Sequence, residues 1–242
     1  MAEDAIDVRK VKRELRNKIK DLIPGGGNLD LCFTCGTCAS GCPATGLDNL
    51  DPRKFLRMLL LGLDDEVMST PWVWMCTMCQ RCIYACPQQV DIPQLVFNVR
   101  ASWPRETRPK GILGSCDMAL KHDTCSAMGV REEDFQFVVE DVLEEVRETQ
   151  PGWEELQAPV NKKGAEFFLN QNSREPVTEP DEMVPLWRIL HIVGADWTYG
   201  TKGWAAENYC LFLADTKSWE HIVRVKAKAV EDLGCKVWLN TE

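Results

Sequence analysis

The stretch CFTCGTCASGCP, residues 32–43, decides how this chain is built, and CTMCQRCIYACP, residues 76–87, repeats its spacing. In each stretch, gaps of two residues separate the first three cysteines, a gap of three residues precedes the fourth, and a proline follows. One pair of cysteines at this spacing could be a redox dithiol or half of a zinc site. Four such cysteines followed by proline match the spacing that binds [4Fe–4S] clusters. The doubled run therefore predicts two [4Fe–4S] clusters and a protein that moves electrons.

The spacing has a physical basis in the shape of the cluster. Four thiolates must converge on a compact cube, and gaps of two residues let three of them surround one side in a tight loop. In bacterial two-cluster ferredoxins, which the repeat resembles, the fourth cysteine of each run binds the other cluster. That rule implies two mixed ligand sets. The first cluster takes Cys32, Cys35, Cys38 and Cys86, and the second takes Cys76, Cys79, Cys82 and Cys42.

Two other uses of cysteine fit less well. Zinc sites close with four ligands, often with histidine, and no histidine lies near either run. Disulfide frameworks belong to small secreted chains, whereas this chain has 242 residues and opens with MAEDAIDVRK, without an apolar signal region. Twelve cysteines in such a chain indicate metal binding in a reducing compartment, so we expect a cytoplasmic protein.

Composition narrows the class further. The hydrophobic share of 45% can supply the cores of one or two domains, and the net charge of −9 argues against nucleic acid as a partner. No apolar run approaches the ~18 residues of a membrane span, so we expect no transmembrane segment.

The N-terminal region predicts a basic amphipathic helix. Between Arg9 and Lys20, seven Lys or Arg accompany one Glu, and glycines at 25–27 end the pattern. The helix either lies on the cluster-binding domain with a solvated basic face or docks an acidic partner. Its apolar residues recur at helical spacing: Val8, Val11, Leu15, Ile19 and Leu22.

The insert between the two runs is also helical in pattern. Asp51-Pro52 reads as an N-cap followed by proline at the first helical position, and residues 53–63 continue as a helix. We therefore expect a mostly α-helical cluster domain rather than the small β-rich ferredoxin. Trp72, Trp74 and Met75 would shield a cluster or simply pack in the core.

Beyond residue 110 the chain changes character. Residues 131–156 carry ten Asp or Glu against two Arg, and an apolar stripe from Phe135 to Val146 predicts an amphipathic helix. Short apolar runs at 166–169, 197–199 and 236–239 alternate with helical patterns, which predicts a β-α-β-α-β unit with a parallel sheet. Ligands of such sheets bind beyond the carboxyl ends of the strands. The expected fold class is α+β overall: a helical two-cluster domain at 1–110, an acidic connector at 111–160 and a small α/β domain at 161–242.

Residues 1–110 resemble the C subunit of heterodisulfide reductase and the related helical ferredoxin modules of quinone- and sulfur-linked complexes. The resemblance rests on the run at 32–43, on Asp51-Pro52-Arg53 with a helix ending near Gly62-Leu63, on Trp74-Met75-Cys76, and on CPQQVDI at 86–92. It implies a relay. In that family the clusters pass electrons between a flavin or iron–sulfur protein (the A subunit) and a protein with cysteine-rich CCG domains (the B subunit). The CCG protein performs the thiol–disulfide chemistry.

Residues 161–242 resemble, more weakly, the first part of a CCG domain. That family places cysteines in the loop after each of three strands. Here the first loop has none, the second has Cys210, and the chain ends at Glu242 where the third would begin. The domain thus reads as degenerate and truncated, and we expect it to bind no cluster. Cys116 and Cys125 are expected to be free buried thiols, with a weak metal site beside His122 as the alternative. Cys210 is expected to be a leftover thiol and Cys235 a small core residue.

Two functions follow from these observations. The first is a non-catalytic electron-transfer subunit of a heterodisulfide-reductase-like complex, with a role in sulfur metabolism. The alternative is the cluster-bearing part of a fused oxidoreductase, glycolate-oxidase-like or quinone-linked, with a substrate site in the C-terminal domain. The missing loop cysteines favour the first, and no catalytic residue is predicted in this chain.

Overall fold

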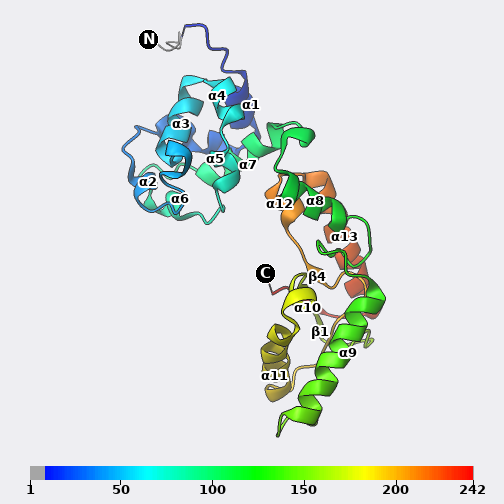
Figure 1. The fold of residues 1–242 in the computed structure, drawn as a ribbon. Helices are drawn as coiled ribbons and strands as arrows, with labels where there is room; N and C mark the ends of the chain where they lie inside the picture. Colours follow the sequence, from blue (N-terminus) through cyan, green and yellow to red (C-terminus); the bar gives the residue numbers. More distant parts are fainter. Residues whose placement is uncertain (1–8, 242) are drawn as a thin grey trace. The chain divides into compact units, whose positions relative to one another are not determined.

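The computed structural model describes residues 9–241, and the chain divides into two compact units, Met1–Pro109 and Lys110–Glu242 (Figure 1). Each unit has its own hydrophobic core. Residues 1–8, with Val8 of the expected first helix, and Glu242 lie outside the described residues. Within residues 9–241, no helix has the length and apolar character needed to cross a membrane.

Every regular element of the first unit, within residues 9–109, is helical, as the sequence predicts. Several of these helices are a single turn, which fits a chain interrupted by cluster-binding loops. The α-helices and 3₁₀ helices (η) are α1 (Glu14–Leu22), η1 (Pro24–Leu31), α2 (Thr37–Ser40), η2 (Leu47–Asn49), α3 (Pro52–Leu61), α4 (Asp64–Ser69), α5 (Trp72–Met75), α6 (Arg81–Ala85), α7 (Ile92–Ser102) and η3 (Arg105–Thr107).

Helices α3 and α7 both contribute buried apolar residues to the core of this unit. Both begin at an aspartate whose carboxylate accepts a backbone N–H three residues on: Asp51 from Lys54 and Asp91 from Gln94. This is the N-cap predicted at Asp51. The apolar faces of the two helices meet α5 in one core, where the rings of Phe55 and Trp72 lie 5.3 Å apart between centroids. The second cysteine run lies between α5 and α7, two helices that share this core.

Helix α1 is shorter than the basic stretch that predicts it. The helix starts at Glu14 because Arg13 has a left-handed backbone, with φ of 60°. Arg13 sits against Gly62, where even one added carbon would collide with its side chain. Arg16 and Lys20 both form ion pairs with Asp30 of the same unit. Part of the basic face is thus engaged within the unit.

The second unit contains the predicted parallel sheet. Strands β1 (Phe167–Leu169), β3 (Trp197–Thr198) and β5 (Val237–Leu239) are all parallel in the order β3-β1-β5. The helices between them include α11 (Val184–Ile192) and α13 (Thr216–Leu233), which occupy the helical patterns expected between the apolar runs. A second parallel pair, β2 (Gln171–Asn172) with β4 (Ala205–Ala206), was not predicted. The remaining elements are α8 (Lys110–Ala119), α9 (Glu132–Thr149), α10 (Glu175–Thr178), η4 (Pro180–Met183) and α12 (Tyr209–Phe212).

The acidic helix α9 packs in the core of this second unit. Its predicted apolar stripe is buried at Phe135, Val139, Val142 and Val146. The ring of Phe135 stacks on Trp204, with centroids 4.0 Å apart. By these contacts, residues 110–160 belong with the sheet that follows them. The acidic side chains occupy the opposite, exposed face of the helix.

Candidate metal centres

The structure brings the eight cysteines of the two runs together in two sets of four. Each set lines one cavity, and the two cavities have similar empty volumes, ≈ 340 Å³ and ≈ 370 Å³. Cys32, Cys35, Cys38 and Cys86 line the first cavity, and Cys76, Cys79, Cys82 and Cys42 line the second. The fourth cysteine of each run therefore lies in the cavity of the other run. Within residues 9–241, no group of three or more histidine, cysteine or acidic side chains is arranged to hold a single metal ion.

The crossing arises from two short helices that contact each other. Helix α2 carries Cys38 and α6 carries Cys82, and each helix starts two residues after the second cysteine of its run. Because α2 and α6 lie against each other, the residues that follow each helix reach the cavity of the other run. Cys42 and Cys86 are the residues at these exits. The proline that follows each of them cannot continue a helix in the usual way and so favours the turn away.

Both cysteine loops have the same backbone twist. The residue two positions after the first cysteine is left-handed in each run: Thr34 with φ of 57° and Met78 with φ of 56°. The residue after the second cysteine is also left-handed: Gly36 with φ of 90° and Gln80 with φ of 65°. This backbone conformation is unfavourable for residues other than glycine, and such strain gathers at binding sites. Successive amides in such turns point to one side, which suits them to face an anion such as a sulfur-rich cluster.

The cysteines that line each cavity differ in how exposed they are. Cys35 and Cys79 are exposed, whereas Cys38 is buried and Cys82 is half-buried. Burial, with the neighbouring cysteines adding to it, raises the pKa of Cys38 to about 11 and that of Cys82 to about 12. Hydrogen bonds act the other way at the exposed pair. The Thr37 hydroxyl lowers the pKa of Cys35, and the Arg81 backbone N–H lowers the pKa of Cys79.

These pKa values bear on what can occupy the cavities. Without a cation, the inner sulfurs remain thiols at neutral pH. A bound metal must displace those protons, because only the thiolate is a ligand. Four sulfurs around each cavity, with backbone amides at the loop, fit a [4Fe–4S] cluster. In addition, the Val90 amide donates to Cys86 Sγ at 3.4 Å.

Helix α7 places Arg100 beside the second cavity. The guanidinium is fully buried, donates from Nε to the Val73 carbonyl at 2.8 Å, and donates from Nη2 to the carbonyl of Cys76. It also lies over the Trp74 ring, 5.4 Å from the centroid. Burial lowers the pKa of Arg100 to about 10, which leaves it charged at neutral pH. Of the three residues expected to shield a cluster, Trp72 lines this cavity, while Trp74 packs beneath Arg100.

A basic groove borders the first cavity. Thr34 and Arg53 line both spaces, and the groove continues along α3 past Lys54 and Arg57, with an empty volume of ≈ 1070 Å³. Its acidic member, Asp51, caps the helix. Sequence reasoning missed this feature. The available signal was the spacing of three cations at positions i, i+1 and i+4 of the helix RKFLR, which places them near one face.

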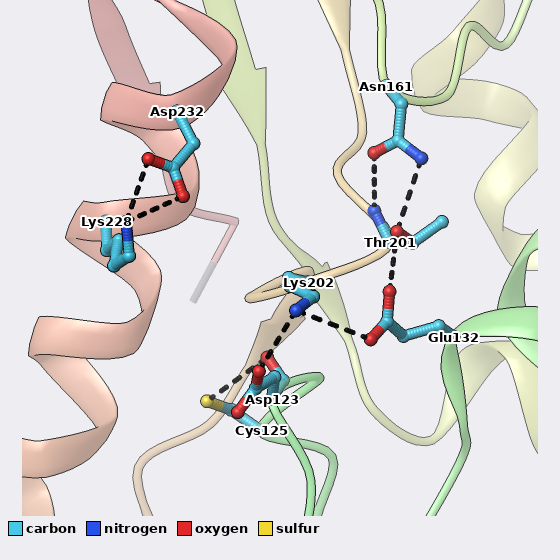
Figure 2. Close-up of polar contacts among 8 residues, drawn as sticks. All are labelled: Asp123, Cys125, Glu132, Asn161, Thr201, Lys202, Lys228 and Asp232. Atoms are coloured by element: carbon cyan, nitrogen blue, oxygen red, sulfur yellow. Dashed lines mark hydrogen bonds and ion pairs between the residues drawn. The ribbon is translucent and has the colours of Figure 1, made fainter.

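In the second unit, the loop after β3 makes contacts with residues of the same unit and also lines a cavity with an empty volume of ≈ 480 Å³. Thr201, just after β3, accepts from and donates to the Asn161 amide group at 3.2 and 3.0 Å, and its hydroxyl donates to Glu132 at 3.0 Å (Figure 2). Lys202 reaches Asp123 at 3.2 Å and Glu132 at 4.0 Å. These contacts tie the loop after β3 to the start of α9. The expected position of a ligand site therefore carries a network of structural contacts.

The cysteines outside the two runs differ from expectation. Cys116 of α8 and Cys210 of α12 form a disulfide, although both were expected to be thiols. The two helices pack against each other and bring residues 94 positions apart into contact, which no local pattern reveals. Since Cys116 is bonded to Cys210, the weak metal site beside His122 loses a ligand. Cys125 is a buried free thiol, and Cys235 is half-buried.

Comparison with known proteins agrees with this geometry. Residues 28–90 match the family described as the 4Fe-4S dicluster domain. The C subunit of the H(2):CoB-CoM heterodisulfide,ferredoxin reductase of Methanothermobacter marburgensis is 38% identical over 98 residues, which is 40% of this chain and 52% of that protein. A protein of Archaeoglobus profundus, described as similar to the C subunit of heterodisulfide reductase, is 35% identical over 91 residues, 36% of this chain and 48% of that protein.

A longer match has lower identity. The iron-sulfur C subunit of the CoB–CoM heterodisulfide reductase of Methanopyrus kandleri is 27% identical over 173 residues, covering 72% of this chain and 79% of that protein. In the more similar relatives the chain spans about half of their length. Residues 28–90 are thus a 4Fe-4S dicluster domain with two [4Fe–4S] clusters, in a chain that resembles the C subunits of heterodisulfide reductases.

Proposed function

We propose that this chain is the electron-transfer subunit of a heterodisulfide-reductase-like complex. The observation that carries the proposal is the reciprocal lining of the two cavities. The fourth cysteine of each run lines the cavity formed by the first three cysteines of the other run. Two clusters held in this way share one small helical module, so an electron can enter at one and leave at the other. The ligand sets are those given above: Cys32, Cys35, Cys38 and Cys86 for the first cluster, and Cys76, Cys79, Cys82 and Cys42 for the second.

The chain's own residues hold and orient this relay. When bound, the clusters supply one-electron chemistry at potentials set by charge, hydrogen bonds and solvent access. The inner cysteines and the apolar core of α3, α5 and α7 keep water from one side of each site. Cys35 and Cys79 stay exposed, so each site has an edge that a partner can approach.

The proposed partners are two other subunits. One is a protein with CCG domains, like the B subunit of heterodisulfide reductase, which would perform the thiol–disulfide chemistry. The other is a flavin and iron–sulfur protein, like the A subunit, which would deliver electrons. The names of the relatives, each a C subunit, support an assembly of several chains, and a role in sulfur metabolism is part of the proposal.

The test is purification of the intact complex under anaerobic conditions with an affinity tag on this chain. We expect it to retain a CCG-domain chain and a flavin-containing chain. We also expect Cys35→Ala and Cys79→Ala to abolish electron flow from reduced flavin to the CCG-domain chain, measured by rapid-freeze spectroscopy. Cys235→Ala is the matched control, since Cys235 lines neither cavity. Unchanged electron flow in the two cluster variants would refute the relay.

A further inference from the structure

One buried charge distinguishes the two cysteine cavities. Arg100 of α7 is 0% exposed, and its guanidinium donates to the carbonyls of Val73 and Cys76. Cys76 is the first cysteine of the second run and lines the second cavity. These bonds fix the cation next to that cavity.

Apart from Arg100, the cations around the two cavities are exposed side chains, and at the first cavity they include Lys54 and Arg57 of the neighbouring groove. Each cavity is lined by four cysteines and by one exposed arginine, Arg53 at the first and Arg81 at the second. These two arginines occupy comparable positions, because each acts on the exposed cysteine of its own cavity, Cys35 or Cys79. Exposed charges are strongly screened by water and salt. The effects of these exposed cations on the two sites should therefore be small.

A buried cation acts differently from an exposed one. Adding an electron to a cluster increases its negative charge, and a nearby positive charge in a poorly polarisable surrounding stabilises that product. Net charge and hydrogen bonding near the sulfurs are among the factors that set cluster potentials. Arg100 keeps its charge across the physiological range, so this stabilisation persists there.

We propose that Arg100 raises the reduction potential of the second cluster above that of the first. When the pair holds one electron, that electron therefore resides mainly on the second cluster at equilibrium. The inference rests on the proposed function, because it needs both clusters in the ligand sets given there. In the step concerned, one electron leaves the reduced first cluster, which is oxidised, and enters the oxidised second cluster, which is reduced. No bond is made or broken and no proton moves. The electron comes from the flavin-containing donor.

The test compares two variants of the full chain. Arg100→Gln keeps a hydrogen-bond donor and removes the charge, whereas Arg100→Lys keeps the charge and changes the donor. The potentials are measured by anaerobic redox titration followed by EPR. The signals are assigned with Cys35→Ala, which should lack the first cluster, and Cys79→Ala, which should lack the second.

We expect Arg100→Gln to lower the potential of the second cluster selectively. The equilibrium constant for moving an electron from the first cluster to the second should fall about tenfold or more, and tenfold is 59 mV for one electron. Arg100→Lys should retain most of the difference. A second-cluster potential unchanged in Arg100→Gln, with full iron content, would overturn the inference.

The unmodified protein supplies an independent measurement if Arg100→Gln does not fold. In it the signal that Cys79→Ala removes should be the one reduced at the higher potential. The opposite order would overturn the inference while leaving two clusters and a relay in place. A failure of the proposed function would give a different result. Either the titration would find fewer than two clusters, or electron flow in the complex would not depend on the clusters.

Discussion

At the scale of single residues, the cysteine loops depend on backbone conformation as much as on sulfur. Thr34, Met78 and Gln80 have left-handed backbones, an arrangement that costs roughly 1–2 kcal/mol for an ordinary residue. The same twist occurs at corresponding places in the two runs. A repeated strain of this kind indicates a shape that the bound group requires, since the free loop would relax to a more favourable conformation.

Gly36 gives this argument a direct test. Its φ is +90°, and an added Cβ would lie 3.4 Å from Arg53. Gly36→Ala should therefore destabilise the first site by about 1–2 kcal/mol, which would speed the loss of that cluster to a chelator roughly 5- to 30-fold. The measurement is anaerobic chelation followed by absorbance, with each cluster identified by EPR.

The matched control lies in the same run. Gly41 has φ of −102°, and an added Cβ there would have nothing within 4 Å. Gly41→Ala should leave chelation rates unchanged. Equal rates in the two variants would show that the left-handed conformation at position 36 is not needed.

Residue chemistry also limits what could be predicted from sequence. The spacing of the cysteines, with the rule of two-cluster ferredoxins, leads to the same two sets that the cavity linings show. Arg100 could not have been found in this way. It follows an apolar stretch near the end of α7 and reads as an ordinary polar residue there. Its buried guanidinium donates hydrogen bonds to the carbonyls of residues 73 and 76, which lie near Arg100 only in the folded chain.

At the scale of elements, α3 connects a cluster site to an exposed basic face. Arg53 lines the first cavity, and Lys54 and Arg57 continue the groove away from it. Cations around a redox site raise the local concentration of anionic partners and speed their encounter, an effect that salt removes. The groove is thus expected to favour anionic reaction partners at the first cluster.

Arg57→Glu tests this expectation. At low ionic strength, ferricyanide should oxidise the reduced protein about two- to fivefold more slowly than it oxidises the unmodified chain, and the cationic oxidant hexaammineruthenium should react faster. Stopped-flow absorbance measures both rates. Lys217→Glu, which changes the same charge on the exposed face of α13, should alter neither rate. If the two variants behave alike, the groove has no local effect.

The disulfide joins α8 to α12 and is a second feature of element packing. Closing a loop between residues 94 apart restricts the unfolded chain, and such bonds typically contribute about 2–4 kcal/mol. The double variant Cys116→Ser, Cys210→Ser should therefore unfold at lower temperature than the unmodified chain. Reductant should lower the midpoint of the unmodified chain and not that of the double variant.

The control for the disulfide is Cys235→Ser, which removes a free thiol of the same unit. It should respond to reductant as the unmodified chain does. An unmodified chain whose unfolding midpoint is insensitive to reductant would contradict the structural role of this bond.

Element prediction succeeded where the pattern was local. The cap at Asp51, the stripe on α9 and the apolar runs of β1, β3 and β5 all mark their own positions. Element prediction failed where the boundaries of an element depend on residues that are distant in the sequence. The start of α1 depends on Arg13 lying against Gly62, and β2 and β4 are only two residues long, so each is defined by its partner.

At the scale of the whole molecule, the chain consists of two units with separate cores and different sources of stability. The first unit is built from short helices around cavities for metal, so its folding should depend on iron. The second unit has a sheet, a disulfide and a continuous apolar core, and its cysteines lie outside the two metal cavities. Their unfolding should therefore respond differently to metal removal.

Calorimetry of the full chain before and after removal of iron measures this difference. We expect chelation to abolish or strongly lower the transition of the first unit and to leave the transition of the second unit in place. Tryptophan fluorescence of variants at Trp72, in the first unit, and Trp187, in the second, assigns the transitions. Loss of both transitions on iron removal would contradict independent stabilisation.

The crossed sets of cysteines are the central claim, and a reciprocal pair of variants tests them most directly. Cys42→Ala and Cys86→Ala are prepared anaerobically, and iron content and EPR are compared with Cys35→Ala and Cys79→Ala. Each variant should lose about four irons, the content of one cluster. Crossing predicts that Cys42→Ala loses the same signal as Cys79→Ala, and that Cys86→Ala loses the same signal as Cys35→Ala. Loss of one common signal in Cys42→Ala and Cys35→Ala would contradict it.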